Sequence, residues 1–231
     1  MVYPPRDWYS LSPRAMHTTI DTQQLTGLVR HQLEHVIPDG VPVAVDVIVR
    51  QALERLETCF ARVKLRLYRK DGASYFDHLH SDQYATFLYL ASNCAWVRGD
   101  DRLAAKLYCL NKAMNGFMCT YDTVLPESFL LIHTVGMLLG KAQYGNYFVA
   151  LHDATIGTDR GKSPRLGNGL VIYGKASIIG DCDVGNNVSV STGTIVRNQS
   201  ISDAHVVAGV SPHLLLKPAK RVLIDEFFDL P

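Results

Sequence analysis

An aliphatic residue recurs at every sixth position between residues 166 and 196. The uninterrupted series is Leu166, Ile172, Ile178, Val184, Val190 and Val196. Neither an α-helix, with 3.6 residues per turn, nor a β-strand, whose side chains alternate with a period of two, keeps such a spacing. A short fixed repeat instead indicates a solenoid, in which each repeat buries its apolar side chains only by stacking on a neighbour.

Four positions after each of these aliphatic residues there is a small or modest side chain. These residues are Leu170, Ala176, Cys182, Val188, Thr194 and Ser200. One large and one small inward residue per repeat suit a narrow prism with a corner after each short strand. Glycines such as Gly174, Gly180 and Gly193 supply the permissive backbone that such corners need. The pattern therefore predicts a β-helix built from six-residue repeats.

The same period extends backwards along the chain. It is kept by Ile156, Ala150, Tyr144, Leu138 and Ile132. Between Ile156 and Leu166, however, the spacing is ten residues instead of six, so segment 157–165 is expected to leave the solenoid as a loop. This loop is polar and basic, and loops on rigid scaffolds often carry binding residues. A tolerated surface insertion is the alternative explanation.

The first half of the chain has helical periodicity. Apolar residues at helical spacing predict helices over 22–36, 43–67, 81–96 and 103–118. Asp21 is a suitable N-cap for the first helix, and Asp71-Gly72 marks a break after the second. Residues 1–20, which contain three prolines, are expected to form an irregular arm.

Composition narrows the classes of protein that fit. The 231 residues carry a net charge of +1, so no charge excess points to nucleic acid or to an anionic membrane as a partner. The five cysteines are scattered and odd in number, which predicts reduced, mostly buried thiols. No apolar run reaches ~18 residues, and no signal peptide is visible at the N-terminus. A cytoplasmic location is expected.

Three segments resemble the serine acetyltransferase family. They are His133-Thr-Val-Gly-Met-Leu-Leu-Gly-Lys-Ala142, Asp153-Ala-Thr-Ile-Gly-Thr158 and Gly161-Lys-Ser-Pro-Arg-Leu-Gly167, followed by the repeats and by Ala208-Gly-Val-Ser-Pro212. The resemblance covers about residues 120–231 well and is nearest to members associated with surface-polysaccharide biosynthesis. It implies an α+β chain, with a helical N-terminal domain over 1–119 and a left-handed parallel β-helix of hexapeptide repeats over 120–231.

The resemblance also implies an activity. Family members are acetyl-CoA-dependent O-acetyltransferases that use acetyl-CoA as co-substrate and need no metal. The expected acceptor is a small molecule with a hydroxyl group, which is L-serine, a serine-like compound or a sugar. The family forms homotrimers with acetyl-CoA between adjacent subunits, and trimers that pair into a dimer of trimers are a further option.

By this resemblance His133 is the catalytic histidine. An imidazole suits a general base because its ordinary pKa of ~6.5 is close to physiological pH. The family pairs this histidine with an aspartate shortly before a proline. The closest match is Asp122, in Asp-Thr-Val-Leu-Pro126, with Glu127 as its rival. His152 follows His133 by nineteen residues, close to the eighteen of one full coil, and is expected near the same corner in a site role.

Acceptor binding is expected from the loop and from the helical domain. The family's loop contains a histidine and an arginine that contact the amino-acid acceptor. Here the loop has Ser163 in place of that histidine, with Arg160 and Lys162 as the neighbouring cations. The substitution weakens the case for free L-serine. Asp82, in Asp-Gln-Tyr84, resembles an acceptor-binding Asp-Lys-Tyr of the family.

Acetyl-CoA is expected along the edge of the solenoid, where the family uses small residues and backbone groups. The matching positions are Gly157, Gly174, Ala176, Thr192 and Gly193. Late in the chain Lys217, with Lys220 and Arg221, is expected to meet phosphates. Corner glycines are also required by the fold itself.

Two other functions remain open at this stage. A γ-carbonic-anhydrase-like metalloenzyme would need three imidazoles around one zinc ion. His133 and His152 lack a third partner, since His205 and His213 lie several coils away. A non-catalytic scaffold or regulatory homologue would keep the solenoid and lose the chemistry.

Overall fold

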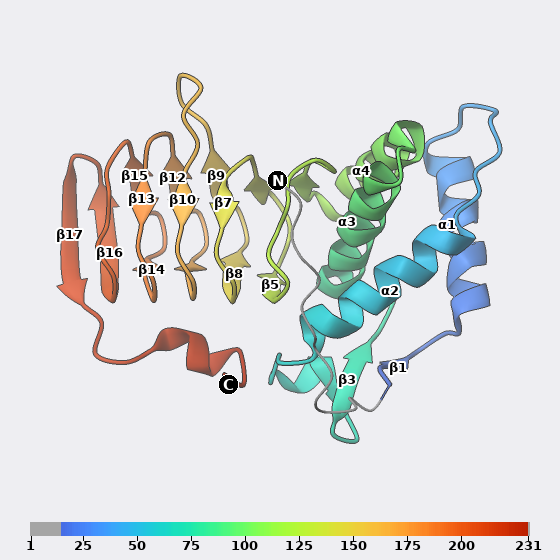
Figure 1. Cartoon of the computed structure of the whole chain (residues 1–231), viewed down its shortest axis with the longest axis horizontal. Coiled ribbons are helices and arrows are strands. Elements are labelled where there is room, and N and C mark those ends of the chain that lie inside the picture. Colours follow the sequence, from blue (N-terminus) through green and yellow to red (C-terminus); the bar gives the residue numbers. More distant parts are fainter. Residues whose placement is uncertain (1–14, 231) are drawn as a thin grey trace.

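The computed structural model describes residues 15–230 and shows an elongated molecule. Four helices gather at one end, and the strands from β4 onward stack in a row towards the other end (Figure 1). Residues 1–14 of the expected irregular arm lie outside the described residues. The following residues include a short strand, β1 (His17–Thr18), which pairs in parallel with β3 (Ala73–Phe76).

The helical domain contains four α-helices in the predicted order. They are α1 (Thr22–Val36), α2 (Asp46–Phe60), α3 (Ser81–Val97) and α4 (Asp101–Asn115). The first has the predicted bounds, and Asp21 caps it as expected, its carboxylate accepting from the Gln24 amide. The third is buried on almost every side and packs between α2 and α4, which explains why its apolar residues are not confined to one face.

The second helix is shorter than the sequence predicts. It ends at Phe60 instead of continuing to residue 67, and a 3₁₀ turn, η1 (Arg66–Tyr68), follows. The intervening backbone bonds elsewhere, because the amide of Lys64 donates to the carbonyl of Phe227 at 3.0 Å. This tertiary contact overrides the local helical pattern. The sequence analysis also missed a small antiparallel pair formed by β2 (Arg69–Lys70) and β3.

Three parallel faces make up the solenoid. The first contains β5 (Phe129–Ile132), β8 (Phe148–Leu151), β11 (Val171–Ile172) and β14 (Ser189–Val190). The second contains β4 (Met118–Cys119), β6 (Leu138–Leu139), β9 (Thr155–Gly157), β12 (Ser177–Ile179) and β15 (Ile195–Arg197). The third contains β7 (Gln143–Tyr144), β10 (Arg165–Leu166) and β13 (Asp183–Val184). An antiparallel pair, β16 (His205–Val210) and β17 (His213–Pro218), closes the stack.

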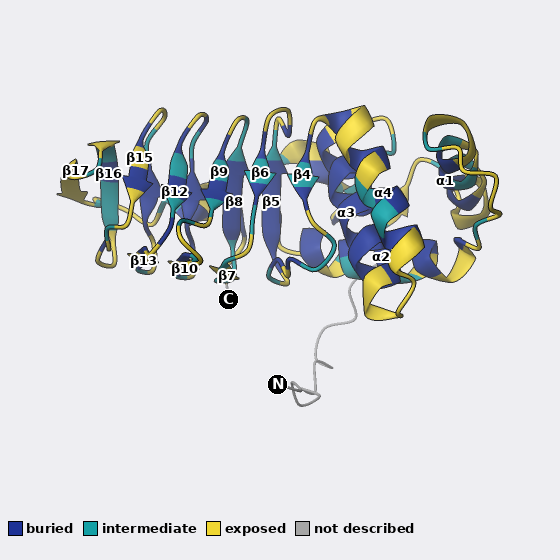
Figure 2. Cartoon of the chain, turned by 90° about the horizontal axis from the view of Figure 1, so that it is seen from above, coloured by how far each residue is buried: buried dark blue, intermediate teal, exposed yellow. Residues whose placement is uncertain are grey.

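The six-residue period is confirmed from Leu166 onward. Ile172 pairs with Val190, and Ile178 pairs with Val196, each eighteen residues apart, which is one coil of three repeats. All six aliphatic residues of the series are at most 5% exposed. Figure 2 shows the strands dark with burial and the corners exposed. Ile178 also pairs with Ile156, twenty-two residues earlier, so the predicted loop adds four residues to that coil.

The backward extension of the period is wrong by one residue in the first coil. Leu131 and Leu139 are buried there, whereas the expected inward residues Ile132 and Leu138 are only half-buried. Leu131 pairs with Ala150, which is nineteen residues later rather than eighteen. The corner between β5 and β6 is longer than a six-residue repeat allows, and two of its backbone amides, those of His133 and Thr134, donate to Asp82 of helix α3.

The C-terminal segment runs back beneath the solenoid to the helical domain (Figure 1). Phe228 is fully buried, and its ring packs edge-on against Tyr147 at 5.5 Å between centroids. The amide of Asp229 donates to the carbonyl of Arg62 at 2.8 Å. The tail therefore ties the end of the solenoid to the residues that follow α2.

Four of the five cysteines are buried, and all five are free; the exposed one is Cys109. Burial raises the pKa of the Cys59 thiol to about 12, so this side chain packs as a small apolar group. Among residues 15–230 no helix is both long enough and apolar enough to cross a membrane.

Candidate active site

Two histidines stand side by side at one corner of the solenoid. Strands β5 and β8 pair in a nineteen-residue register, with Ile132 opposite Leu151. His133 and His152 each follow directly, so they occupy the same position on successive coils. Their ring centroids are 6.4 Å apart. The one-residue displacement expected between them is absent, because the longer first corner shifts the register.

The same corner continues on the next two coils. Strand β11 pairs with β8 through Ile172 and Ala150, and with β14 through Ile172 and Val190. Two residues further on, this register brings Gly174 next to His152, and Thr192 next to Gly174. A Cβ atom at Gly174 would lie 2.5 Å from the His152 ring. The glycine therefore provides the space in which that ring lies.

Asp82, at the start of α3, fixes the backbone of this corner. One oxygen of its carboxylate accepts from the His133 amide at 2.9 Å, and the other accepts from the Thr134 amide at 3.1 Å. His133 has φ +55°, a left-handed conformation that costs energy for most residues, and the two hydrogen bonds hold it there. The His133 ring is 75% exposed, and its Nδ1 lies 3.9 Å from the same carboxylate, which is buried.

Within this chain the charged partner of Asp122 is Lys141. Its carboxylate accepts a 2.5 Å hydrogen bond from Lys141, which holds the pKa of Asp122 below its usual value. Within one chain the carboxylate facing His133 is that of Asp82, which the sequence analysis had given to the acceptor. The rival Glu127 lines a cavity together with Arg55 of α2 and Leu90 of α3. The helix that carries Asp82 is distant in sequence, so spacing gave no signal for this contact.

The predicted loop leaves the solenoid as a tight hairpin, visible as the projection above β9 and β10 (Figure 1). Asp159 and Lys162 exchange backbone hydrogen bonds of 3.0 and 2.9 Å. Arg160 and Gly161 form its tip, both with positive φ, which is the geometry of a type I′ turn. Arg160 and Lys162 are exposed and Ser163 is half-buried.

The base of the hairpin is clamped to the next coil, a feature that the sequence analysis missed. The carboxylate of Asp159 accepts from Asn198 at 2.8 Å and from two nitrogens of Arg197 at 3.0 and 3.2 Å. The hydrogen bonds from Asn198 and then Arg197 lower the pKa of Asp159. These hydrogen bonds hold the start of the loop in one position relative to the next coil.

The residues expected to bind acetyl-CoA separate into different environments. Gly174 lies against the His152 ring, and Thr192 and Gly193 are exposed at the same corner. Gly157 is half-buried at the start of the hairpin. The Ala176 side chain is fully buried inside the prism, at the small inward position of its repeat. A contact between acetyl-CoA and the backbone of this residue stays a prediction.

Lys217 lines a cavity of about 310 Å³ at the end of the solenoid. Lys220 and Arg221 line the same cavity, with Val206 and Leu223 as apolar walls. Arg221 is paired with Glu226, whereas neither lysine has a carboxylate partner in the described part of the chain. Two cations are therefore free to meet an anionic group.

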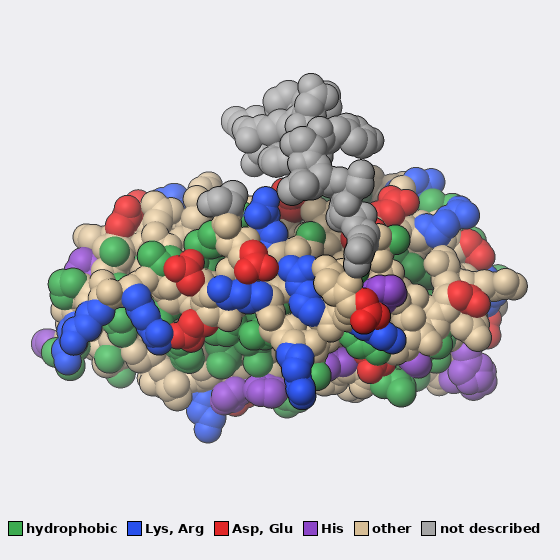
Figure 3. All heavy atoms as spheres, turned by 90° about the horizontal axis from the view of Figure 1, so that it is seen from below, with side chains coloured by type: hydrophobic (Ala, Val, Ile, Leu, Met, Phe, Trp, Pro, Cys, Tyr) green, Lys and Arg blue, Asp and Glu red, His purple; other side chains and the backbone are tan. Residues whose placement is uncertain are grey.

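No group of three or more side chains suited to hold a metal ion is found among residues 15–230. On the face shown in Figure 3, basic and acidic side chains are intermixed. This face therefore has no large area of a single charge, in agreement with the net charge of +1 of the whole chain.

We expect Gly174→Ala to displace the His152 ring. The backbone of residue 174 has no positive φ, so alanine is excluded only by the clash of its Cβ with the ring. Overpacking of this kind costs about 1–3 kcal/mol in the free energy of unfolding. Chemical denaturation measures the loss, and a shift of the His152 ring signals in an NMR spectrum reports the displacement.

Gly27→Ala is the matched control, because nothing lies within 4 Å of a Cβ there and the residue is in helix α1. It should stabilise the protein by up to about 1 kcal/mol. Unchanged stability together with unchanged ring signals in Gly174→Ala would show that the ring does not occupy this space.

The fold and the histidine corner define the class of protein to which the chain is similar. The chain is a hexapeptide-repeat protein with a helical N-terminal domain and a left-handed parallel β-helix. A crystal structure of serine acetyltransferase from Brucella abortus strain S19 superposes with a TM-score of 0.64 over 86% of this chain and 85% of that one, at 19% identity. No family model matches the sequence.

Sequence comparison points in the same direction. Serine acetyltransferase 2 of Arabidopsis thaliana is 28% identical over 155 residues, covering 64% of this chain and 45% of the relative. Serine acetyltransferase of Synechococcus elongatus is 25% identical over 118 residues, covering 49% and 48%. The chain thus spans about half the length of the curated relatives that it matches. By sequence and fold it is serine acetyltransferase-like.

Proposed function

We propose that the protein is an acetyl-CoA-dependent O-acetyltransferase with His133 as its general base. The observation that carries the proposal is the pair formed by an exposed His133 and His152 at one solenoid corner, with Asp82 behind the first ring. Acyl transfer to an alcohol needs a base that can reach the reacting hydroxyl. The likeness to serine acetyltransferases supports the same chemistry.

In the proposed reaction the His133 imidazole removes the proton of the acceptor hydroxyl as its oxygen attacks the thioester carbonyl. The C–S bond of acetyl-CoA then breaks, and the imidazolium returns the proton to the leaving thiolate. The Asp82 carboxylate, 3.9 Å from Nδ1, stabilises the imidazolium between these steps. His152 is close enough to the first ring to position the acceptor or to donate a hydrogen bond to the thioester oxygen.

We further assign the site to the surface between adjacent subunits of a homotrimer. His133 is 75% exposed, so a single chain leaves its ring open to water. A neighbouring solenoid would close this side, and catalysis gains from such exclusion of water. In the trimer Asp122 of a neighbouring copy remains a candidate for a second carboxylate. Pairing of two trimers is an additional proposal for the assembly.

Lys217 and Lys220 are suited to the phosphates of acetyl-CoA. They line one cavity without carboxylate partners in the described chain, and ammonium groups bind phosphate as point charges. The corner positions Thr192 and Gly193 are exposed and leave room for an extended molecule to approach the histidines.

The acceptor is a small hydroxyl compound, with L-serine, a serine-like compound and a sugar-linked hydroxyl as the candidates. The hairpin presents Arg160 and Lys162, which are suited to an acceptor carboxylate, but Ser163 is a weaker partner than an imidazole. A role in surface-polysaccharide biosynthesis and a cytoplasmic location are part of this proposal, with a glycan precursor as the acceptor.

Release of free CoA from acetyl-CoA tests the proposal. We expect release that depends on an acceptor when L-serine and hydroxylated sugars are supplied one at a time. Mass spectrometry of the product should show an increase of one acetyl group. Release equal to the rate without acceptor for the whole panel would favour the non-catalytic scaffold instead.

A further inference from the structure

Two histidines on the exposed face of helix α1 lie in direct contact. His31 and His35 are four residues apart, so their side chains are neighbours on the helix surface, and both are exposed. Their ring centroids are 4.0 Å apart, and the ring planes are tilted by 35°. The acetyl transfer proposed above uses neither residue.

A backbone hydrogen bond holds the second ring in one orientation. Nδ1 of His35 lies 2.8 Å from the carbonyl oxygen of His31. Because a carbonyl oxygen only accepts, Nδ1 carries the proton of this bond, and the lone pair of the neutral ring is on Nε2. Histidines that bind metals are commonly fixed in this way, with one ring nitrogen bonded to a carbonyl group and the other facing the ion.

The helix also leaves room for an ion at this place. Gly27 precedes His31 by one turn on the same face, and no atom lies within 4 Å of a Cβ built there. Helical side chains lean towards the N-terminus, so both rings lean towards this open position. On the opposite face Val29 and Leu33 are fully buried, which anchors the backbone beneath the rings.

We propose that His31 and His35 chelate one divalent transition-metal ion of the kind that imidazoles bind, namely Cu²⁺, Ni²⁺ or Zn²⁺. Mg²⁺ and Ca²⁺ are not expected there, because these ions prefer oxygen ligands. Metal–nitrogen bonds of about 2.1 Å place the two coordinating nitrogens about 3 Å apart, which rings already in contact reach by a small movement. Water fills the remaining coordination positions of the ion.

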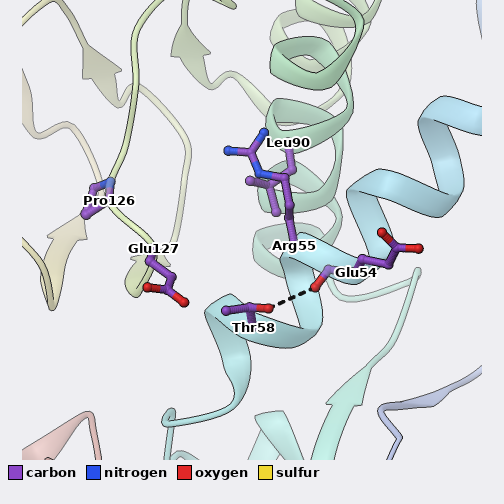
Figure 4. A pocket seen from close by; sticks show the side chains of 6 residues that line it. All are labelled: Glu54, Arg55, Thr58, Leu90, Pro126 and Glu127. Carbon is purple, nitrogen blue, oxygen red and sulfur yellow. Dashed lines mark hydrogen bonds between the residues drawn. The ribbon is translucent and has the colours of Figure 1, made fainter. Parts of the chain in front are cut away.

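Two other groupings of donor side chains are less suited to share one ion. The rings of His133 and His152 are 6.4 Å apart, which is 2.4 Å more than the 4.0 Å on α1. Glu54 and Glu127 line a cavity at the junction of the helical domain and the solenoid, but their carboxylates point in different directions (Figure 4). The α1 pair is therefore expected to bind such an ion before either of them.

Isothermal titration calorimetry with Ni²⁺ tests the proposal on the full-length protein, prepared without a histidine tag. The wild type should bind Ni²⁺, and an excess of Mg²⁺ should not compete. His31→Gln and His35→Gln should each weaken the binding by at least about ten-fold, since loss of even an outer-shell partner costs about 10- to 100-fold in metal affinity. Glutamine is a better helix former than histidine, so α1 is kept in both variants.

His17→Gln is the matched control, because His17 is an exposed histidine on β1 and lies outside α1. Its affinity for Ni²⁺ should equal that of the wild type. His133→Asn should also keep this affinity, which separates the α1 pair from the proposed active site. Absence of Ni²⁺ binding, wild-type affinity in either α1 variant, or loss of the binding in His133→Asn would each overturn the proposal.

Discussion

His133→Asn should reduce acetyl transfer by about 10²- to 10⁴-fold, which is the usual contribution of a general acid–base group. We choose asparagine because it tolerates the left-handed φ of +55° at this corner, so that the substitution removes the imidazole without straining the backbone. The ring is 75% exposed, so little packing is lost. Steady-state release of CoA with the best acceptor measures the effect, and circular dichroism verifies the fold.

His213→Asn is the matched control for this prediction. His213 is an exposed histidine on β17, in the antiparallel pair that closes the solenoid. Its substitution should leave the rate within about two-fold of the wild type, since surface changes away from a site have small effects. Equal rates in His133→Asn and in the wild type would remove His133 from the reaction.

The sequence predicted the solenoid because its repeat is local and regular. Every inward position from Leu166 to Val196 is set by the same stacking of one coil on the next. The prediction was wrong in the first coil, where Leu131 rather than Ile132 is inward. There the chain leaves the helical domain, and contacts with α3 rather than the repeat determine the spacing.

The shortened α2 and the docked tail have the same cause. Residues 61–65 were expected to continue the helix, yet the amide of Lys64 bonds to Phe227, which is more than 150 residues away. No local pattern in either segment signals the partner. Long-range contacts of this kind override propensity, and a single sequence does not show them.

The candidate site was only partly predictable for a similar reason. His133 and His152 came together because solenoid geometry converts sequence spacing into position. The carboxylate behind His133 comes from Asp82 on a helix of the other domain, so no spacing rule applied to it. The clamp between Asp159 and Arg197 depends on the conformation of the hairpin, which the loop composition did not specify.

Asp82→Ala should lower both the stability of the protein and the rate of acetyl transfer. The carboxylate accepts from the amides of His133 and Thr134, and Thr134 is only 2% exposed, so its amide would lose its acceptor. Hydrogen bonds to a charged group are worth about 1.5–3 kcal/mol each, and we expect a loss of about 2–4 kcal/mol in the free energy of unfolding. Without these bonds the left-handed backbone that presents the His133 ring is no longer held.

Two further variants separate the role of the Asp82 carboxylate from the general effect of removing a negative charge. Asp82→Asn keeps one carbonyl acceptor and should lose less stability than Asp82→Ala, because one of the two amides remains bonded. Asp46→Ala removes an exposed carboxylate whose ion pair with Arg30 is worth at most about 1 kcal/mol, so its rate should be unchanged. If Asp82→Ala unfolds at the same denaturant concentration as the wild type and transfers acetyl at the same rate, the corner is held by other contacts. If only kcat falls while stability is kept, Asp82 acts chiefly on the charge of the His133 ring rather than on its backbone.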